Sequence, residues 1–88
     1  MISHVSQQFL SRLAKLPLDV QRQAYQAYQK FQQDPNHPSL NFERIQGRAN
    51  TYSARVSKGY CVLGTLRKGE IYWYWIGTHA EYDKLINA

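Results

Sequence analysis

The amino-acid sequence predicts a single α+β domain that spans residues 1–88. We expect an N-terminal helical hairpin to pack on one face of a small antiparallel sheet of three or four strands, with a short helix at the C-terminus. Up to residue 33, apolar residues recur every three or four positions, which is the period of an amphipathic helix. After Pro35 and Pro38 they alternate in short runs separated by glycines, which is typical of antiparallel strands. A chain of 88 residues forms one core, so two domains are excluded.

The first half of the chain predicts two helices. Apolar residues at helical spacing define a first helix over residues 5–16, and Pro17 ends it. Asp19 suits the first turn of a second helix, because a carboxylate there interacts favourably with the helix dipole. Pro35 and Pro38 end this second helix. Its buried face is expected to contain Val20, Ala24, Ala27, Tyr28 and Phe31. Because the connecting turn is short, we expect the two helices to be antiparallel.

Two turns determine the expected register of the sheet. The first is a three-residue loop, Ser57-Lys58-Gly59, with the glycine in the left-handed conformation. The second is a two-residue hairpin at Lys68-Gly69. An earlier strand is expected over residues 41–46. The pairs that follow are Val56 with Tyr60, Arg55 with Cys61, Ala54 with Val62, Leu66 with Ile71, Gly64 with Trp73, and Val62 with Trp75.

This register gives the sheet two faces of different character. The face that the helices should cover contains Tyr52, Ala54, Val56, Tyr60, Val62, Leu66, Ile71, Trp73 and Trp75. The opposite face contains Ser53, Arg55, Cys61, Leu63, Thr65, Tyr72, Tyr74 and Ile76. This second face is too apolar for a surface that only contacts water, so it is a candidate interaction groove. The alternative is that the C-terminal helix and nearby loops shield it.

The last predicted helix begins where the final strand ends. Thr78-His79-Ala80-Glu81 fits a capping box, in which Thr78 caps the helix and Glu81 reaches back to it. His79 then lies in the first turn of a helix that ends near Asn87.

Three residues near this corner could perform phosphodiester chemistry. By the expected register Arg55 lies on the open face, His79 at the corner and Tyr82 one turn further on. A histidine can exchange protons near neutral pH, and an arginine can bind a phosphate bidentately. Each residue alone is a weak indication, because a lone histidine is more often a surface or capping residue. Tyr74 could stack on a base, although aromatic residues on a sheet more often pack.

Composition restricts the partners of the protein. Eleven Lys and Arg against six Asp and Glu give a net charge of +5, which favours a nucleic acid or an acidic protein segment. The single cysteine and three histidines have no metal-ligand spacing, so we expect no metal and no cofactor. The longest apolar run, residues 71–76, is too short to cross a membrane. The first residues do not form a signal peptide, so we expect a cytoplasmic protein.

Three stretches resemble the RelE/ParE superfamily of bacterial type II toxins. They are Asn36-His37-Pro38-Ser39-Leu40, Tyr52-Ser53-Ala54-Arg55-Val56 and Trp73-Tyr74-Trp75-Ile76-Gly77-Thr78-His79-Ala80-Glu81-Tyr82-Asp83-Lys84-Leu85. Within the last, Gly77-Thr78-His79 is similar to YafQ-type toxins. The resemblance covers nearly the whole chain, except that the usual first strand is shortened to residues 2–4 or lost.

The resemblance implies a toxin that cuts mRNA, usually within the ribosome, and that a cognate antitoxin neutralises. In such toxins a 2′-hydroxyl of the RNA attacks the scissile phosphate, and we expect no metal ion to be needed. His79 is then an acid or base, Arg55 stabilises the charge of the phosphorane, and Tyr82 completes the expected catalytic set. The expected RNA-binding residues are Arg44, Arg48, Lys58 and Tyr74.

One position departs from the family pattern and leaves alternatives open. Many relatives have an arginine where this chain has Cys61, and Arg55 lies opposite this position in the expected register. One alternative is a ParE-like inhibitor of DNA gyrase without nuclease activity, and another is an inactive member that only binds its antitoxin. In each case we expect an acidic or amphipathic antitoxin segment on the open face or along the sheet edge.

Overall fold

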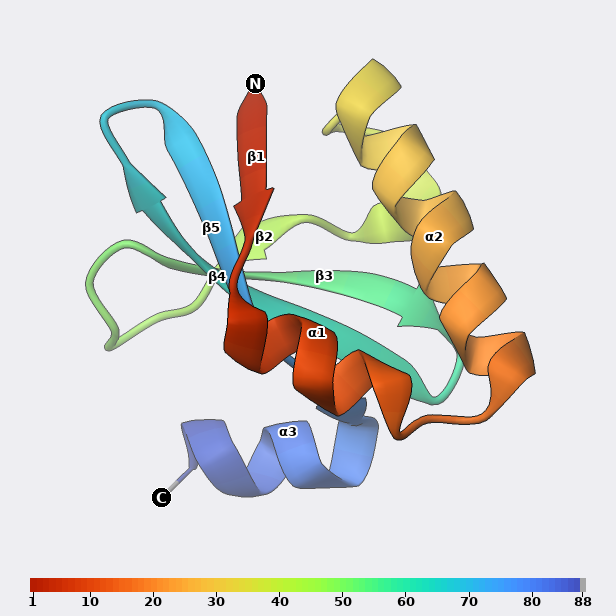
Figure 1. Cartoon of the computed structure of the whole chain (residues 1–88). Helices are drawn as coiled ribbons and strands as arrows, with labels where there is room; N and C mark the ends of the chain where they lie inside the picture. The colour runs from red at the N-terminus through yellow and green to blue at the C-terminus, as the bar shows by residue number, and fades with distance from the viewer. Residues whose placement is uncertain (88) are drawn as a thin grey trace.

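The computed structural model describes residues 1–87 and contains three α-helices and a five-stranded sheet (Figure 1). The elements are β1 (Ile2–Val5), α1 (Gln7–Ala14), α2 (Leu18–Gln33), a 3₁₀ turn η1 (Pro38–Leu40), β2 (Glu43–Arg44), β3 (Thr51–Ser57), β4 (Tyr60–Arg67), β5 (Glu70–Thr78) and α3 (His79–Ile86). The strand order is β1-β5-β4-β3-β2. The predicted α+β class is confirmed. Within residues 1–87, none of the helices has the length and apolar character that a membrane-spanning helix requires.

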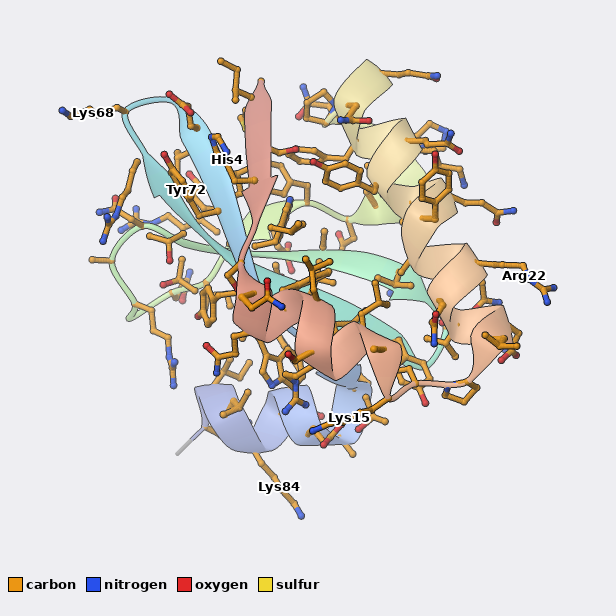
Figure 2. All side chains as sticks on the ribbon, in the orientation of Figure 1. His4, Lys15, Arg22, Lys68, Tyr72 and Lys84 are labelled. Carbon is orange, nitrogen blue, oxygen red and sulfur yellow. The ribbon has the colours of Figure 1, made fainter. Side chains whose placement is uncertain are left out.

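The N-terminal strand makes the sheet larger than predicted, and mixed instead of antiparallel. β1 pairs in parallel with β5 at one edge, and α1 begins at Gln7, two residues after the predicted start. Ser6 separates the two elements, because its hydroxyl accepts a hydrogen bond of 3.0 Å from the Phe9 amide and caps α1. His4 of β1 stacks on Tyr72 of β5 with 4.5 Å between the ring centroids (Figure 2). The strand expected from the family resemblance is therefore present.

The first turn differs from the prediction, because β3 contains a bulge at Val56. Ser57 pairs with Tyr60 across a two-residue turn, and Gly59 does not adopt a positive φ. A two-residue turn alone would shift the register by one residue and exchange the two faces of the strand. The bulge absorbs that extra residue, so the predicted pairs of Arg55 with Cys61 and of Ala54 with Val62 are confirmed.

The register of β5 also differs from the prediction, because this strand contains a bulge at Tyr74. The hairpin at Lys68-Gly69 forms with positive φ at both residues, and the expected pairs next to it are confirmed. Beyond Tyr74 the register shifts, so Trp75 pairs with Leu63 and Ile76 pairs with Val62. The predicted pair of Val62 with Trp75 is wrong, and Trp75 and Ile76 lie on the faces opposite to those expected.

The larger core lies between the sheet and the helices α1 and α2, as predicted. Trp73 is 3% exposed, and its ring packs edge-on against Phe31 with 5.4 Å between the centroids. The buried residues of this core are Phe9, Ala24, Phe31, Leu40, Ala54, Val62, Ile71, Trp73 and Ile76. Ser3 of β1 donates a hydrogen bond of 2.8 Å to the hydroxyl of Tyr28, which ties the edge strand to α2.

A smaller core lies on the opposite face, beneath α3. Its buried residues are Ile45, Cys61, Leu63 and Trp75. Tyr82 and Ile86 of α3 pack against them. For this part of the face the alternative considered above is confirmed, since the C-terminal helix and the loop before β3 shield it.

An apolar cavity of about 430 Å³ lies between α1, α2 and the sheet. Its walls include Phe9, Leu13, Ala24 and Trp73. Leu10 at its rim is 43% exposed. An apolar opening therefore remains at Leu10, between the helices and the edge strand.

We expect Trp73→Ala to lower the free energy of unfolding by about 3–5 kcal/mol, because truncation of a large buried aromatic side chain leaves a cavity. Tyr25→Ala is the control, since Tyr25 is 65% exposed and its loss should change stability by about 0.5 kcal/mol or less. Urea denaturation of both variants measures the effect. An unchanged midpoint for Trp73→Ala would contradict the burial of this ring.

Candidate functional site

The candidate site is a pocket of about 200 Å³ between the β3–β4 hairpin and the start of α3. The residues that line it are Asn41, Glu43, Ser53, Ala54, Arg55, Ser57, Lys58, Tyr60, Cys61, His79 and Tyr82. The pocket brings together four of the seven residues that the sequence suggested, namely Arg55, Lys58, His79 and Tyr82. All three members of the expected catalytic set are among them.

The capping box at Thr78 places His79 at this pocket. The Thr78 hydroxyl accepts a hydrogen bond of 3.1 Å from the Glu81 amide, and the Thr78 amide donates one of 2.9 Å to the Glu81 carboxylate. The His79 amide donates a hydrogen bond of 2.9 Å to the carbonyl of Gly59 in the β3–β4 turn. The first residue of α3 is thus fixed beside the turn that contains Lys58.

The His79 ring has two neighbours within α3. It stacks on Tyr82 with 5.7 Å between the centroids, and its Nε2 lies 3.8 Å from the Asp83 carboxylate. Because the two rings stack, Tyr82 helps to orient the imidazole. The His79 side chain remains 64% exposed, so a ligand in the pocket can reach it.

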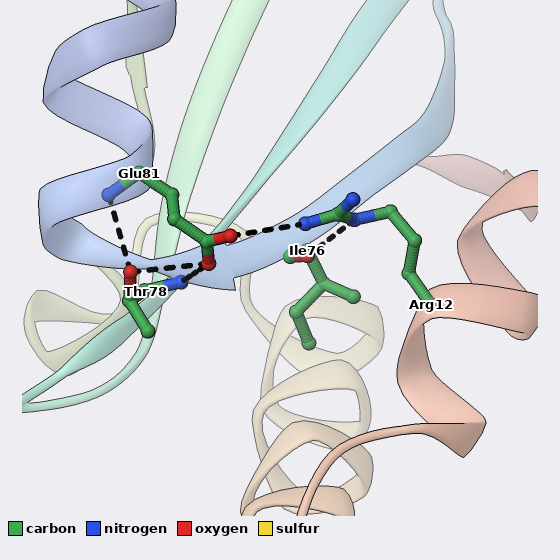
Figure 3. Close-up of polar contacts among 4 residues, drawn as sticks. All are labelled: Arg12, Ile76, Thr78 and Glu81. Carbon is green, nitrogen blue, oxygen red and sulfur yellow. Dashed lines mark hydrogen bonds and ion pairs between the residues drawn. The ribbon is translucent and has the colours of Figure 1, made fainter.

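Arg12 of α1 anchors the corner from the other side (Figure 3). Its Nε donates a hydrogen bond of 2.8 Å to the carbonyl of Ile76, and its guanidinium lies 3.8 Å from the Glu81 carboxylate. The guanidinium also lies 5.1 Å from the centre of the Trp75 ring, within the range of a cation–π interaction. Arg12 does not line the pocket, so it acts on the site through the position of α3.

Gly77 is required by the close approach of Trp75 to the backbone at this corner. A Cβ atom at position 77 would lie 2.4 Å from a ring carbon of Trp75 and 2.9 Å from the Glu81 carboxylate. Any side chain at position 77 would displace one of them. The Gly77-Thr78-His79 segment is therefore determined by packing as well as by capping.

The pocket is positively charged. Within residues 1–87, neither Arg55 nor Lys58 forms an ion pair, and both are exposed. Glu43 is the only carboxylate among the described residues that line the pocket. The described part of the chain contains no cluster of three or more potential metal ligands. The arrangement suits a phosphate held by cations, with an imidazole and one carboxylate available for proton transfer.

Cys61 lines the pocket as an inert thiol. Burial, and secondarily the nearby Asp83 carboxylate, raise the pKa of the Cys61 thiol to about 11. Since the thiolate is the nucleophilic form, Cys61 is not a nucleophile near neutral pH. Its partner across the strands, Arg55, is the only arginine among the described residues that line the pocket.

Three expected RNA-binding residues lie outside the pocket. Arg44 is exposed on β2, and Arg48 donates a hydrogen bond from its guanidinium to the carbonyl of Leu85 near the end of α3. Tyr74 packs against the smaller core at the bulge. A role in RNA binding stays a prediction for all three.

Sequence reasoning missed several pocket residues. Ser53 could have been found, because it alternates onto the same face as Arg55 in the predicted strand. Glu43 enters the pocket because β2 pairs with β3, where it lies opposite Ser53. No local pattern indicates that pairing.

The stability of the junction between β5 and α3 should depend on pH. Hydrogen bonds from the Thr78 amide and hydroxyl, with a smaller effect of Arg12, lower the pKa of Glu81 below its ordinary value of 4.5. A carboxylate whose pKa falls on folding stabilises the folded state above that ordinary value, and the contribution is lost as the pH falls through the lowered pKa. We expect Glu81→Gln to be less stable than the wild type at pH 7 and the difference to shrink in acid. Denaturation across this pH range measures it, and a difference that stays constant would contradict the role of the charge.

Comparisons with known proteins agree with this architecture. The family model described as the ParE-like toxin domain matches residues 18–84. A comparison with curated protein sequences finds no significant match. Among solved structures, a chain of the RelB–RelE antitoxin–toxin complex from Methanococcus jannaschii is similar, with a TM-score of 0.74 and 15% identity over 93% of this chain and 96% of that one.

Two structures from Escherichia coli are also similar. YafQ from strain BL21(DE3) has a TM-score of 0.68 and 16% identity, over 91% of this chain and 94% of that one. A chain of the intact RelBE toxin–antitoxin complex has a TM-score of 0.65 and 15% identity, over 86% and 93%. At such low identity these structures establish a shared fold, while the family match covers most of the sequence. The chain therefore belongs to the ParE-like toxin domain family, within the RelE/ParE superfamily of toxins.

Proposed function

We propose that this protein is a toxin that cleaves mRNA on the ribosome without a metal ion. The observation that supports this most directly is the convergence of Arg55, Lys58 and His79 in one pocket. A phosphate between the two cations would lie beside an imidazole that can give or take a proton. RNA is the required substrate, because its own 2′-hydroxyl is the nucleophile.

The proposed reaction is a transesterification within the RNA. The 2′-oxygen forms a bond to phosphorus while the bond from phosphorus to the 5′-oxygen breaks, which leaves a cyclic phosphate and a 5′-hydroxyl. One proton leaves the 2′-hydroxyl and another reaches the departing 5′-oxygen. His79 performs one of these transfers, and the Glu43 carboxylate in the same pocket is a second group able to accept a proton. Arg55 and Lys58 stabilise the charge that develops on the phosphorane oxygens.

We also propose a cognate antitoxin as the protein partner. The net charge of +5 favours an acidic segment, and RelB–RelE structures with this fold are antitoxin–toxin complexes. Because α3 covers much of the face expected to be open, the apolar cavity between α1 and α2 is the better place for apolar side chains of that segment. An amphipathic segment can insert its apolar face there and leave its acidic residues near the surface cations.

Gyrase inhibition is the second candidate function. The observation in its favour is the ParE-like description of the matching family. An inactive, antitoxin-binding member is the third, since Cys61 stands where many relatives have an arginine.

We expect His79→Ala to slow mRNA cleavage by about 10²–10⁴-fold, because it removes one acid–base group from the transition state. Cell-free translation with purified protein, followed by mapping of mRNA ends, measures the rate. His4→Ala is the matched control, because His4 lies on β1 at the far edge of the sheet and should leave cleavage unchanged.

Each other outcome has a distinct meaning. Undiminished cleavage by the His79→Ala variant in EDTA would exclude His79 and shift the catalytic role to Tyr82 and the pocket cations. Gyrase-dependent DNA breaks without RNA cleavage by the wild type would establish the second candidate function. If neither activity occurs, the inactive member is the correct interpretation.

We expect co-expression with the neighbouring reading frame to yield a stable complex, which Leu10→Glu weakens by at least about tenfold. A carboxylate at the rim of the apolar cavity would have to lose its hydration when the partner binds. Leu18→Glu is the matched control, because Leu18 is 68% exposed and does not line the cavity. Titration of the purified proteins measures the affinity. If no small partner is retained and the isolated protein is harmless on expression, the toxin assignment loses its main support.

A further inference from the structure

A second polar groove lies between α2 and the β3–β4 hairpin. It has a volume of about 410 Å³ and differs in character from the apolar cavity. The residues that line this groove, called the α2 groove below, are Gln23, Gln26, Ala27, Lys30, Ser39, Leu40, Arg55, Val56, Ser57 and Lys58. Three of them are cations, and none is a carboxylate.

Lys30 is the cation that the candidate site does not include. Its ammonium lies 3.5 Å from the hydroxyl of Ser39, whose oxygen lies 2.8 Å from Nδ1 of His37. This contact directs the ammonium toward η1, at the groove that Lys30 and Ser39 both line. In residues 1–87 Lys30 forms no ion pair, so its charge is available to a ligand.

The α2 groove and the candidate site meet at the edge of the sheet. Both are lined by Arg55, Ser57 and Lys58. Among the described residues, β2 pairs only with Tyr52 and Ser53 of β3, so this edge of β3 has no neighbouring strand from Arg55 onward. An extended strand of nucleic acid can therefore pass from the candidate site over this edge into the groove.

We propose that the α2 groove binds backbone phosphates of the nucleotides that flank the cut, with Lys30 as its distal contact. This inference rests on the proposed function. RNA is favoured over an acidic protein segment because the groove is continuous with the candidate site and only three of the described residues that line it are apolar. None of the lining residues is aromatic, so the groove offers no surface for base stacking and should not depend on base sequence.

The test compares short and long RNA. Oligonucleotides of about three and about nine nucleotides, with 2′-O-methyl groups to prevent cleavage, are titrated against the wild type and Lys30→Gln. We expect Lys30→Gln to weaken binding of the long RNA by about two- to fivefold, the range of one exposed ion pair, and to leave the short RNA unaffected. For the long RNA, the slope of log affinity against log salt concentration should decrease by about one, because one phosphate contact is lost.

Arg22→Gln is the matched control, because Arg22 lies on the same helix and points away from the rest of the molecule (Figure 2). It should change neither affinity. Equal effects of the two variants, or no effect of Lys30→Gln on the long RNA, would overturn the inference. So would a Lys30→Gln variant that loses antitoxin affinity and keeps its affinity for the long RNA.

The result also separates this inference from the function on which it rests. If the wild type cleaves mRNA but Lys30→Gln binds the long RNA unchanged, the inference about the α2 groove is wrong and the proposed cleavage stands. Length-dependent binding through Lys30 in a protein that cuts no mRNA supports the groove and overturns the proposed cleavage.

Discussion

The bulge at Tyr74 in β5 is the constraint on which the rest of the structure depends. Strict alternation along β5 would direct Trp75 toward α1 and α2, and Ile76 away from them. The extra residue reverses both directions, so Ile76 completes the larger core and Trp75 completes the smaller one. α3 consequently has a buried apolar surface to pack on, and its first residue is fixed beside the β3–β4 turn. A bulge that re-aims side chains next to a functional pocket is a recurring device in sheets.

Arg12 extends the influence of this bulge to the helical half of the protein. The Trp75 ring beneath its guanidinium is the one that the bulge turned, and the Ile76 carbonyl that accepts its hydrogen bond is the next residue. No residue of α1 or α2 lines the candidate site, yet α1 is joined through Arg12 to the carboxylate that caps α3. The position of His79 is therefore determined jointly by the sheet, by the capping box and by a helix from the opposite face.

Most of the fold could be predicted from the sequence, because its signals are local. The Lys68-Gly69 hairpin, the capping box at Thr78 and the helical spacing before Pro35 depend on neighbouring residues only. β1 was hidden because Val5 continues the apolar spacing of α1. The bulges at Val56 and Tyr74 could not be predicted, since packing between distant residues selects them. The same holds for the site: Arg55 and His79 were recognisable by residue type, but Glu43 enters only through a long-range strand pairing.

The candidate site is open to water, and this bears on how the proposed cleavage can occur. The His79 side chain is 64% exposed, and Arg55 and Lys58 are exposed as well. Water screens the attraction between such cations and a phosphate, so they stabilise developing charge far less than they would in a site that excludes water. A surface that covers the bound RNA would strengthen the effect of the same cations without adding a catalytic group. This is a physical reason for the proposed activity to require mRNA held on the ribosome, where RNA and protein can close over the pocket, instead of free RNA.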